Sequence, residues 1–442
     1  MVSEINNKIK ESVQKFLEVS KNKEIQIISH FDTDGITSAT IMIKTLKKLD
    51  KTFSIKIIKN LEREMVYSLP KNKITIFLDL ASGSLNHISN TELENVFIID
   101  HHKINQDIPK NVTIINPELH DKQKISSSGL TYLFCKEIDK ENKEFAKLAI
   151  LGMIGDSLDK EISKLNNGIL NDSEIKIKHG AKIYPSTRPL NCALEYNSSP
   201  FIPGVTGNVK GVLELLRDAN INPKQKGYPS LLELNKEEME KLVTAITLRI
   251  PKSNSEEIVG DIYLLKFYNK LEDAREISSK INACSKINNP NIALQFCMEI
   301  PTAKQKSEAI YVKYRQHIVS ALKFIEKTEK IQGKGYMIVN TKENIKPTII
   351  ETAASIISKS KVYDNGTAIV AIAYEESKIK ISAHRVGDSG RNVKQLLTET
   401  TTKFQTEVNG HEFAAGALID KQHEEPFLKE LKKNLEIEIV RV

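Results

Sequence analysis

The chain has 442 residues, 40% of them hydrophobic and 27% charged, which is the composition of a globular protein too long for one ordinary core. It contains no apolar run long enough to span a membrane, and its N-terminus is typical of an amphipathic helix rather than a signal peptide. We therefore expect a cytoplasmic protein with no membrane partner. The 64 Lys and Arg exceed the 57 Asp and Glu, and the resulting net charge of +7 permits a polyanionic ligand without requiring one. The four cysteines form no CxxC pair, which argues against a zinc site.

The first 160 residues alternate short apolar runs with helical patterns, among them 38–49 and 146–154. Strands that alternate with helices form parallel sheets with helices on their faces, so we predict a mostly parallel sheet. The predicted buried strands, all rich in Ile or Val, are Ile25–Ser29, Phe53–Ile58, Ile74–Leu78, Val96–Ile99 and Val112–Ile115.

The pattern becomes irregular from about residue 160 to 245, where Pro and Gly recur, and we expect a long ordered loop over 186–207. Helices are predicted over Leu234–Leu248, Ala274–Cys284 and Thr302–Lys327. The last of these carries apolar residues at helical spacing on one face and is the predicted connector between two lobes.

The C-terminal part has the pattern of a second, smaller α/β lobe. Its predicted strands are Gly335–Asn340, Ala368–Ala373, Lys378–Ser382 and Glu436–Val440, and its predicted helices are Ile349–Ser358 and Pro426–Leu435. The expected fold class is therefore α/β, with a mostly parallel-sheet domain joined by a long helix to a smaller α/β domain.

Four acidic or histidine clusters follow elements of the first lobe. His30, Asp32 and Asp34 follow the first strand, Asp79 and the run Asp100-His101-His102 each follow another strand, and Asp156 ends an apolar helical run. Ligands of open parallel sheets bind beyond the carboxyl ends of the strands, so these side chains are expected to meet in one cleft. A lone Asp at a strand end is usually a helix cap, but four clusters at matching positions favour a shared site.

So many carboxylates in one cleft would repel each other unless cations neutralised them. Carboxylates mixed with imidazole suit Mn²⁺ or a similar divalent ion. Two such ions could clamp the attacking and leaving oxygens of a phosphoryl displacement and turn a bridging water into the nucleophile. The sequence therefore predicts a two-metal site, with Mn²⁺ first and Mg²⁺ as the alternative.

Five segments resemble a known family. HFDTDGITSA, IFLDL, VFIIDHHK and LGMIGDS, in this order, are similar to the four motifs of the DHH phosphoesterase superfamily. GHEFAAG, which begins at Gly410, resembles the glycine-histidine signature of the DHHA1 domain. TRPLNCALEYNSSPFIPGVTGN is similar to a loop of the archaeal RecJ-like branch. The resemblance implies a DHH metal-binding catalytic domain over 1–165, a region over 166–301 that completes the first lobe, a connector over 302–332 and a DHHA1 substrate-binding domain over 333–442.

The resemblance also implies roles for individual residues. The implied metal ligands are His30, Asp32, Asp34, Asp79, Asp100, His101 and Asp156. His102 is expected to act near the scissile phosphate, together with Asp100 and His101. The candidate phosphate contacts are Arg188, Arg385, Arg391, Gly410 and His411. The family usually has two or more glycines before this histidine, whereas Asn409 and Gly410 stand here, and the choice between Arg385 and Arg391 stays open.

Three functions follow from the resemblance. The first is a RecJ-like exonuclease that acts on single-stranded DNA or RNA. The low aromatic content of 6% favours binding to the sugar-phosphate backbone of the nucleic acid over stacking on its bases. The second is a phosphodiesterase for short oligoribonucleotides or cyclic dinucleotides. The third is a non-catalytic subunit of the replication machinery associated with the GINS complex. The polarity of cleavage is not encoded in any readable motif.

Overall fold

The computed structural model describes residues 4–120, 122–197, 200, 202–250, 258–360, 362–404 and 406–436. The chain divides into two compact units, one formed by 1–178 and 262–311 and the other by 179–261 and 312–442. The sequence-based division kept all of 166–301 with the first lobe and so differs from this division over 179–261. The domain boundaries themselves stay a prediction.

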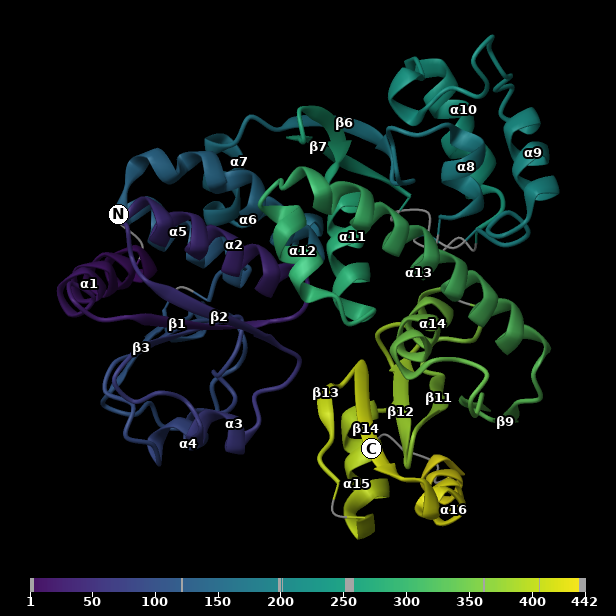
Figure 1. The fold of residues 1–442 in the computed structure, drawn as a ribbon. Coiled ribbons are helices and arrows are strands. Elements are labelled where there is room, and N and C mark those ends of the chain that lie inside the picture. Colours follow the sequence, from purple (N-terminus) through teal and green to yellow (C-terminus); the bar gives the residue numbers. More distant parts are fainter. Residues whose placement is uncertain are drawn as a thin grey trace. The chain divides into compact units, whose positions relative to one another are not determined.

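The first unit is built on a parallel five-stranded sheet of order β2-β1-β3-β4-β5 (Figure 1). All five predicted strands are present, and only β1 differs, because it extends one residue further to His30. Successive side chains of each strand point to opposite faces of the sheet, so they contribute alternately to two hydrophobic cores. Their bounds are β1 (Ile25–His30), β2 (Phe53–Ile58), β3 (Ile74–Leu78), β4 (Val96–Ile99) and β5 (Val112–Ile115).

Helices cover both faces of this sheet. The larger core packs one face against several helices, and the smaller core packs the other face against two short ones. The first set is α1 (Glu4–Val19), α2 (Thr33–Lys48), α5 (Ser127–Ile138), α6 (Ala146–Gly155), α11 (Ala274–Lys286) and α12 (Pro290–Cys297), and the second is α3 (Arg63–Tyr67) and α4 (Leu85–Ser89). Helix α2 begins five residues before its predicted start, because Asp32 caps it by accepting the backbone N–H of Gly35 at 3.0 Å.

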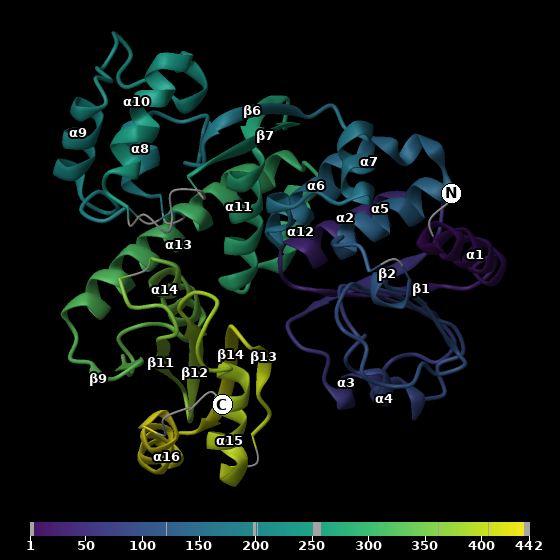
Figure 2. The same ribbon diagram turned by 180° about the vertical axis from the view of Figure 1, so that it is seen from behind.

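The C-terminal part of the second unit is a six-stranded sheet of order β13-β14-β12-β11-β10-β9. Only the pairing of β10 with β11 is parallel, and the other described pairs are antiparallel. The predicted strand Glu436–Val440 lies outside the described residues. The strands are β9 (Ile331–Gly333), β10 (Tyr336–Asn340), β11 (Ala368–Glu375), β12 (Lys378–Arg385), β13 (Asn409–His411) and β14 (Ala414–Asp420), and the helices are α14 (Pro347–Lys359), α15 (Val393–Thr401) and α16 (Glu424–Glu436) (Figure 2).

Residues 179–261 contain more helix than the sequence pattern predicted. Helix α8 (Leu190–Glu195) lies inside the predicted loop, and α9 (Val209–Asp218) follows it directly. Helix α9 is capped by the side chain of Asn208 and buries Val212, Leu215 and Leu216. These apolar residues have helical spacing, but the Pro and Gly residues nearby made the segment resemble a loop in the sequence. Helix α10 (Lys236–Thr247) lies within the predicted range. A small sheet of order β6-β7-β8 joins β6 (Lys176–Ala181), β7 (Val259–Phe267) and β8 (Lys270–Asp273).

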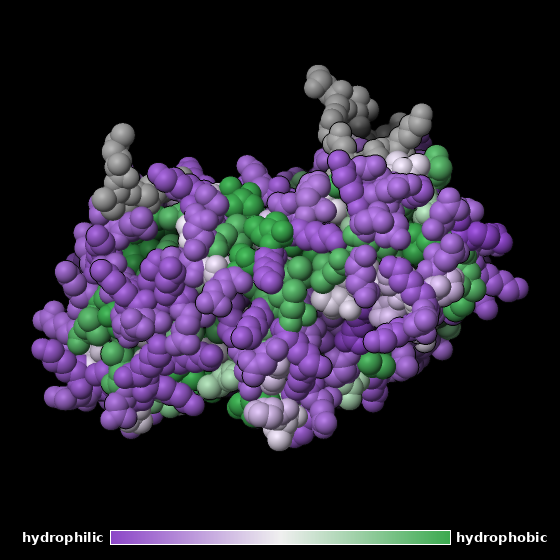
Figure 3. Space-filling view, turned by 90° about the horizontal axis from the view of Figure 1, so that it is seen from above, coloured by the Kyte–Doolittle hydropathy of each residue, from purple (hydrophilic) through white to green (hydrophobic). Residues whose placement is uncertain are grey.

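The predicted connector is the longest helix described, α13 (Pro301–Lys327). The chain passes from the first unit to the second within it, between Tyr311 and Val312. Neither α13 nor any other helix in the described ranges is both long and apolar enough to cross a membrane. Hydrophilic residues cover most of the face drawn in Figure 3, with apolar residues in smaller patches between them.

Candidate metal centre

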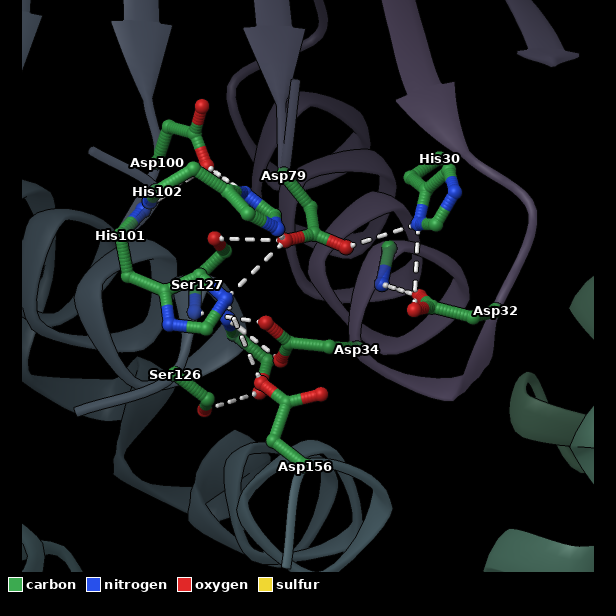
Figure 4. A network of polar contacts seen from close by, with 12 residues as sticks. His30, Asp32, Asp34, Asp79, Asp100, His101, His102, Ser126, Ser127 and Asp156 are labelled. Carbon is green, nitrogen blue, oxygen red and sulfur yellow. Dashed lines mark hydrogen bonds and ion pairs between the residues drawn. The ribbon is translucent and has the colours of Figure 1, made fainter. Parts of the chain in front are cut away.

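The acidic and histidine clusters of the first unit converge at the carboxyl ends of its strands (Figure 4). His30 ends β1, Asp79 follows β3, and the run 100–102 follows β4, which is the next strand in the sheet. Asp156 is the C-terminal cap of α6. Because parallel strands end at the same edge, His30, Asp79 and His102 meet there, and α6 brings Asp156 to the same place.

One group of three ligand atoms joins the first and second clusters. His30 Nδ1 lies 3.1 Å from an oxygen of Asp32 and 3.2 Å from Asp79 Oδ2. The donor atoms of His30, Asp32 and Asp79 all lie within 4.8 Å of one another. This spacing is compatible with a single cation bound by one imidazole and two carboxylates.

Two further groups share residues with the first or with each other. Asp34, His101 and Asp156 form one, and Asp79, His101 and His102 form the other. His101 Nε2 lies 3.4 Å from Asp156 Oδ2 and 3.6 Å from Asp79 Oδ1. Asp79 therefore offers one oxygen to the His30 side and the other to the His101 side, the arrangement that a carboxylate bridging two cations requires.

The N-terminus of α5 holds the carboxylates of Asp34 and Asp79. Asp34 accepts the backbone N–H of Ser127 at 2.7 Å and that of Ser128 at 2.9 Å. The hydroxyl of Ser127 donates to Asp79 Oδ1 at 3.0 Å. Sequence reasoning missed these serines, although the run of Ser126, Ser127 and Ser128 before an apolar helix is a cap signal.

Glycine is required where α2 and α6 approach the cluster. A Cβ at Gly35 would lie 2.3 Å from the carbonyl oxygen of His30, so a side chain there would force α2 away from β1. A Cβ at Gly152 would lie 2.0 Å from Ser128 Oγ and 2.3 Å from Asp34 Oδ1. Both contacts are closer than real Cβ atoms come, so these glycines allow the elements to meet.

Asp100 is arranged differently from the other acids. Its Oδ1 accepts the backbone N–H groups of His101 and His102 at 2.8 and 3.3 Å and lies 2.7 Å from His102 Nδ1. Its Oδ2 accepts the backbone N–H of Ser82 at 3.0 Å. Asp100 is in none of the three groups of the described residues that could hold an ion. Asp100 therefore orients His102, and its predicted role as a metal ligand stays a prediction.

The electrostatics of the cluster fit a pair of cations. Burial and the charges of neighbouring carboxylates raise the pKa of Asp79 and of Asp156 well above the ordinary value. Among the described residues, Asp156 Oδ2 is buried and accepts no hydrogen bond, although His101 Nε2 lies 3.4 Å from it. An acceptor without a donor, beside carboxylates that repel one another, is what a divalent ion would satisfy.

The pKa values of two imidazoles are also raised, which for a histidine favours the charged form. Burial lowers the pKa of His102, but its contact with Asp100 outweighs this and raises that pKa to about 9. Burial likewise opposes the charged form of His30, while Asp32 raises its pKa. The pKa of Asp32 is in turn held below its ordinary value, because His30 outweighs the effect of burial. The contact with Asp100 therefore favours the charged form of His102, whose side chain is just over half exposed.

The candidate phosphate contacts all belong to the second unit. The Arg385 guanidinium donates to the carbonyl oxygen of Asp388 at 3.2 Å, and the ring of Phe413 lies 4.1 Å from it. The backbone N–H of Phe413 donates to His411 Nδ1 at 3.2 Å, so Arg385 and His411 belong to one cluster at the β13–β14 hairpin. Gly410 has a φ of +122°, a backbone conformation that glycine adopts readily and other residues avoid, which explains why glycine stands at this position.

The two other arginines lie elsewhere in that unit. Arg391 donates to the carbonyl oxygens of Asn434 and Leu435 at 2.6 and 2.9 Å, where its guanidinium holds the last turn of α16. Arg188 lies just before α8, and its backbone N–H is 3.4 Å from the carbonyl oxygen of Pro185. Of the two arginines left open by the sequence, Arg385 is therefore the one that the structure brings to His411.

Sequence models of three domains match the chain. They are the DHH family N-terminal domain over 24–153, the DHH-CID domain over 184–259 and the DHHA1 domain over 333–436. The chain belongs to the DHH family. All the residues of the three groups that could hold a metal ion lie in its DHH domain except Asp156, which follows the matched range by three residues. Arg385 and His411 lie in its DHHA1 domain.

The chain is also similar to individual relatives and solved structures. An uncharacterized protein of Methanocaldococcus jannaschii is 27% identical over 92% of this chain and 91% of its own length. A putative prophage-derived single-strand DNA-specific exonuclease of Bacillus subtilis is 26% identical over 36% of this chain and 30% of its own length. The crystal structure of exonuclease RecJ bound to manganese matches with a TM-score of 0.62 at 13% identity, covering 99% of this chain and 96% of that one. That of CDC45 from Entamoeba histolytica matches with a TM-score of 0.70 at 14% identity, covering 98% and 99%. Both likenesses show the fold.

Proposed function

We propose that this DHH-family chain is a metal-dependent phosphodiesterase that hydrolyses the backbone of single-stranded nucleic acid from an end. The observation that carries the proposal is the set of interlocking three-residue groups that share Asp79 and His101. An isolated acidic cluster is common on protein surfaces, but here Asp34 and Asp79 are buried, Asp34 accepts two backbone N–H groups, and Asp79 accepts the hydroxyl of Ser127. A rigid, prearranged donor set is what catalysis by two cations needs.

The proposed ligands fall into two sets. His30, Asp32 and Asp79 would hold one ion, and the second would be held by Asp34, Asp79, His101 and Asp156. When bound, the ions would polarise the phosphoryl oxygens and lower the pKa of a water molecule. We retain Mn²⁺ as the first candidate and Mg²⁺ as the second, because imidazole and carboxylate together suit Mn²⁺.

His102 is the proposed side chain that acts on the phosphate. Asp100 keeps its ring oriented and protonated, so it presents a positive charge and a proton at a partly exposed position. A cation there would stabilise the charge that develops on the phosphoryl oxygens, and its proton could pass to the leaving oxygen. In the DHHA1 domain, Arg385 and His411 are the proposed contacts for substrate phosphates.

Three observations support single-stranded nucleic acid as the substrate. The net charge is +7, a relative over part of the chain carries the name of a single-strand DNA-specific exonuclease, and the long stretch between the DHH and DHHA1 domains favours a long substrate. We place this activity in the cytoplasm.

The test incubates the purified protein and Mn²⁺ with single strands of DNA and of RNA, labelled in turn at each end. Release of mononucleotides is the expected result, and the label that appears first gives the polarity. Asp79→Asn should lower the rate by at least about a hundredfold, because it alters the carboxylate shared by both ligand sets. Asp50→Asn, which removes an exposed carboxylate at the end of α2, is the matched control and should retain the rate.

Two outcomes would favour the alternatives. Cleavage confined to dinucleotides or cyclic dinucleotides would replace the exonuclease with a phosphodiesterase for short substrates. If no phosphodiester is cut, while Asp100→Ala retains binding to GINS or another replication protein, the chain is a scaffold subunit. Catalysis and such binding can also coexist in one protein.

A further inference from the structure

We propose that Phe31 and Lys59 form a nucleotide-binding subsite beside the metal centre, with a base stacked on the ring and a phosphate bound by the ammonium. The inference rests on the proposed function, since it specifies the substrate of the same site. Neither residue belongs to the ligand groups described above.

Phe31 lies between two of the proposed ligands in sequence and beside one of them in space. It separates His30 from Asp32, and its ring centroid lies 5.1 Å from that of His30 with the planes at 80°. His30 in turn reaches Asp32 and Asp79 through Nδ1 (Figure 4). The aromatic ring is therefore in contact with the imidazole that would hold an ion.

The ring of Phe31 is not explained by packing of the sheet. It is only partly buried, and it is absent from the two hydrophobic cores described on the faces of the five-stranded sheet. An apolar ring left partly in water beside a polar cluster costs hydration free energy, which a bound flat ligand would recover. The position therefore fits a ligand with an aromatic face.

Lys59 supplies a cation to the same place. It follows β2, whose last residue Ile58 pairs with His30 in β1, and its Nζ lies 5.8 Å from the centroid of the Phe31 ring. Lys59 is exposed, and among the described residues it has no carboxylate within ion-pair distance. An ammonium beside a ring, without an acidic partner, is suited to binding a phosphate next to a stacked base.

These two groups specify the kind of ligand. A ring face accepts every base, so the subsite gives no sequence preference, while a base held in a duplex is already stacked and cannot be placed on it without unpairing. The expected ligand is an unpaired nucleotide next to the bond that is cut. The subsite thus provides a physical reason for preferring a single-stranded end.

The experiment compares two oligonucleotides that differ only in whether their terminal nucleotides carry bases or are abasic. Binding is measured by fluorescence anisotropy with Ca²⁺ in place of Mn²⁺, and cleavage is measured with Mn²⁺. The wild-type protein should bind the strand with bases about tenfold more tightly than the abasic one. Phe31→Ala should abolish most of this difference, and Phe31→Trp should preserve it. Lys59→Ala should weaken both strands alike and reduce the salt dependence of binding.

The chain provides a matched control at another exposed aromatic–cation pair. The Arg63 guanidinium lies 5.3 Å from the ring of Tyr67, which is 43% exposed, and Tyr67→Ala should leave the preference for bases unchanged. If Phe31→Ala binds both oligonucleotides as the wild-type protein does, the subsite is excluded. If the base preference depends on Phe31 but no strand is cut, the subsite stands and the proposed nuclease activity fails.

Discussion

Asp79, which belongs to both proposed ligand sets, has an unusual backbone conformation. Its φ is +59°, in the left-handed region, and Ala81 two residues later has a φ of +84°. Such conformations cost about 1–3 kcal/mol for residues other than glycine and persist where the surroundings impose them. The backbone N–H of Asp79 donates to the carbonyl oxygen of Ile99, and Ser127 donates to its carboxylate, so both neighbours hold the turn in place.

Ser127 contacts both proposed ligand sets and should therefore control metal affinity. Its N–H binds Asp34 and its hydroxyl binds Asp79, so Ser127→Ala removes one bond to the shared carboxylate. We expect Mn²⁺ affinity to fall by about 10- to 100-fold, measured by isothermal titration calorimetry. Ser128→Ala is the comparison, because among the described residues its hydroxyl is hydrogen-bonded to Ala149 and Ser126 and to no carboxylate. Equal affinities for the two variants would contradict the role assigned to Ser127.

Gly152 should be intolerant of even one added methyl group. In Gly152→Ala the Cβ would overlap Ser128 and Asp34, so we expect a loss of about 1–3 kcal/mol in the free energy of unfolding. Gly168 is also helical, in α7 (Lys164–Asp172), but a Cβ there would meet no atom within 4 Å. Gly168→Ala should therefore stabilise the protein by about 0.4–1 kcal/mol. Denaturant unfolding of both variants without metal tests the pair, and a stable Gly152→Ala protein would rule out this packing.

At the scale of elements, the sequence predicts most of the first unit, because short Ile- and Val-rich runs between helices identify parallel strands. The positions of the acids at strand ends were likewise readable from the chain. The α5 contacts were not, since Ser127 is 93 residues from Asp34 and no local pattern encodes their meeting. The contacts of Asp100 were unreadable for a related reason, because a motif does not reveal which backbone N–H groups and which imidazole a carboxylate contacts.

The contact of Arg391 with helix α16 allows a test that distinguishes the role of Arg391 from that of Arg385, the arginine near His411. Arg391 holds the carbonyl oxygens at the end of this helix, so Arg391→Ala should lower the free energy of unfolding of the second unit by about 1–3 kcal/mol. Arg385→Ala should instead raise KM for single-stranded substrates. Thermal unfolding and steady-state kinetics on both variants measure this division, and a raised KM with normal stability in Arg391→Ala would reverse the assignment.

At the scale of the whole molecule, the two compact units separate the proposed tasks. The residues that could hold metal lie in the first unit, and the cluster of Arg385 and His411 lies in the second. A phosphodiesterase of this kind would need both, because one unit would supply the chemistry and the other would hold the substrate. All the proposed metal ligands nonetheless lie in the first unit, so cation binding can be measured without any nucleic acid.

The most direct measurement is the number of Mn²⁺ ions bound per chain by the metal-free protein, determined by equilibrium dialysis with circular dichroism to verify folding. Two ions per wild-type chain are expected, and Asp79→Asn should lose at least one of them while remaining folded. A folded wild-type protein that takes up neither Mn²⁺ nor Mg²⁺ would contradict the account.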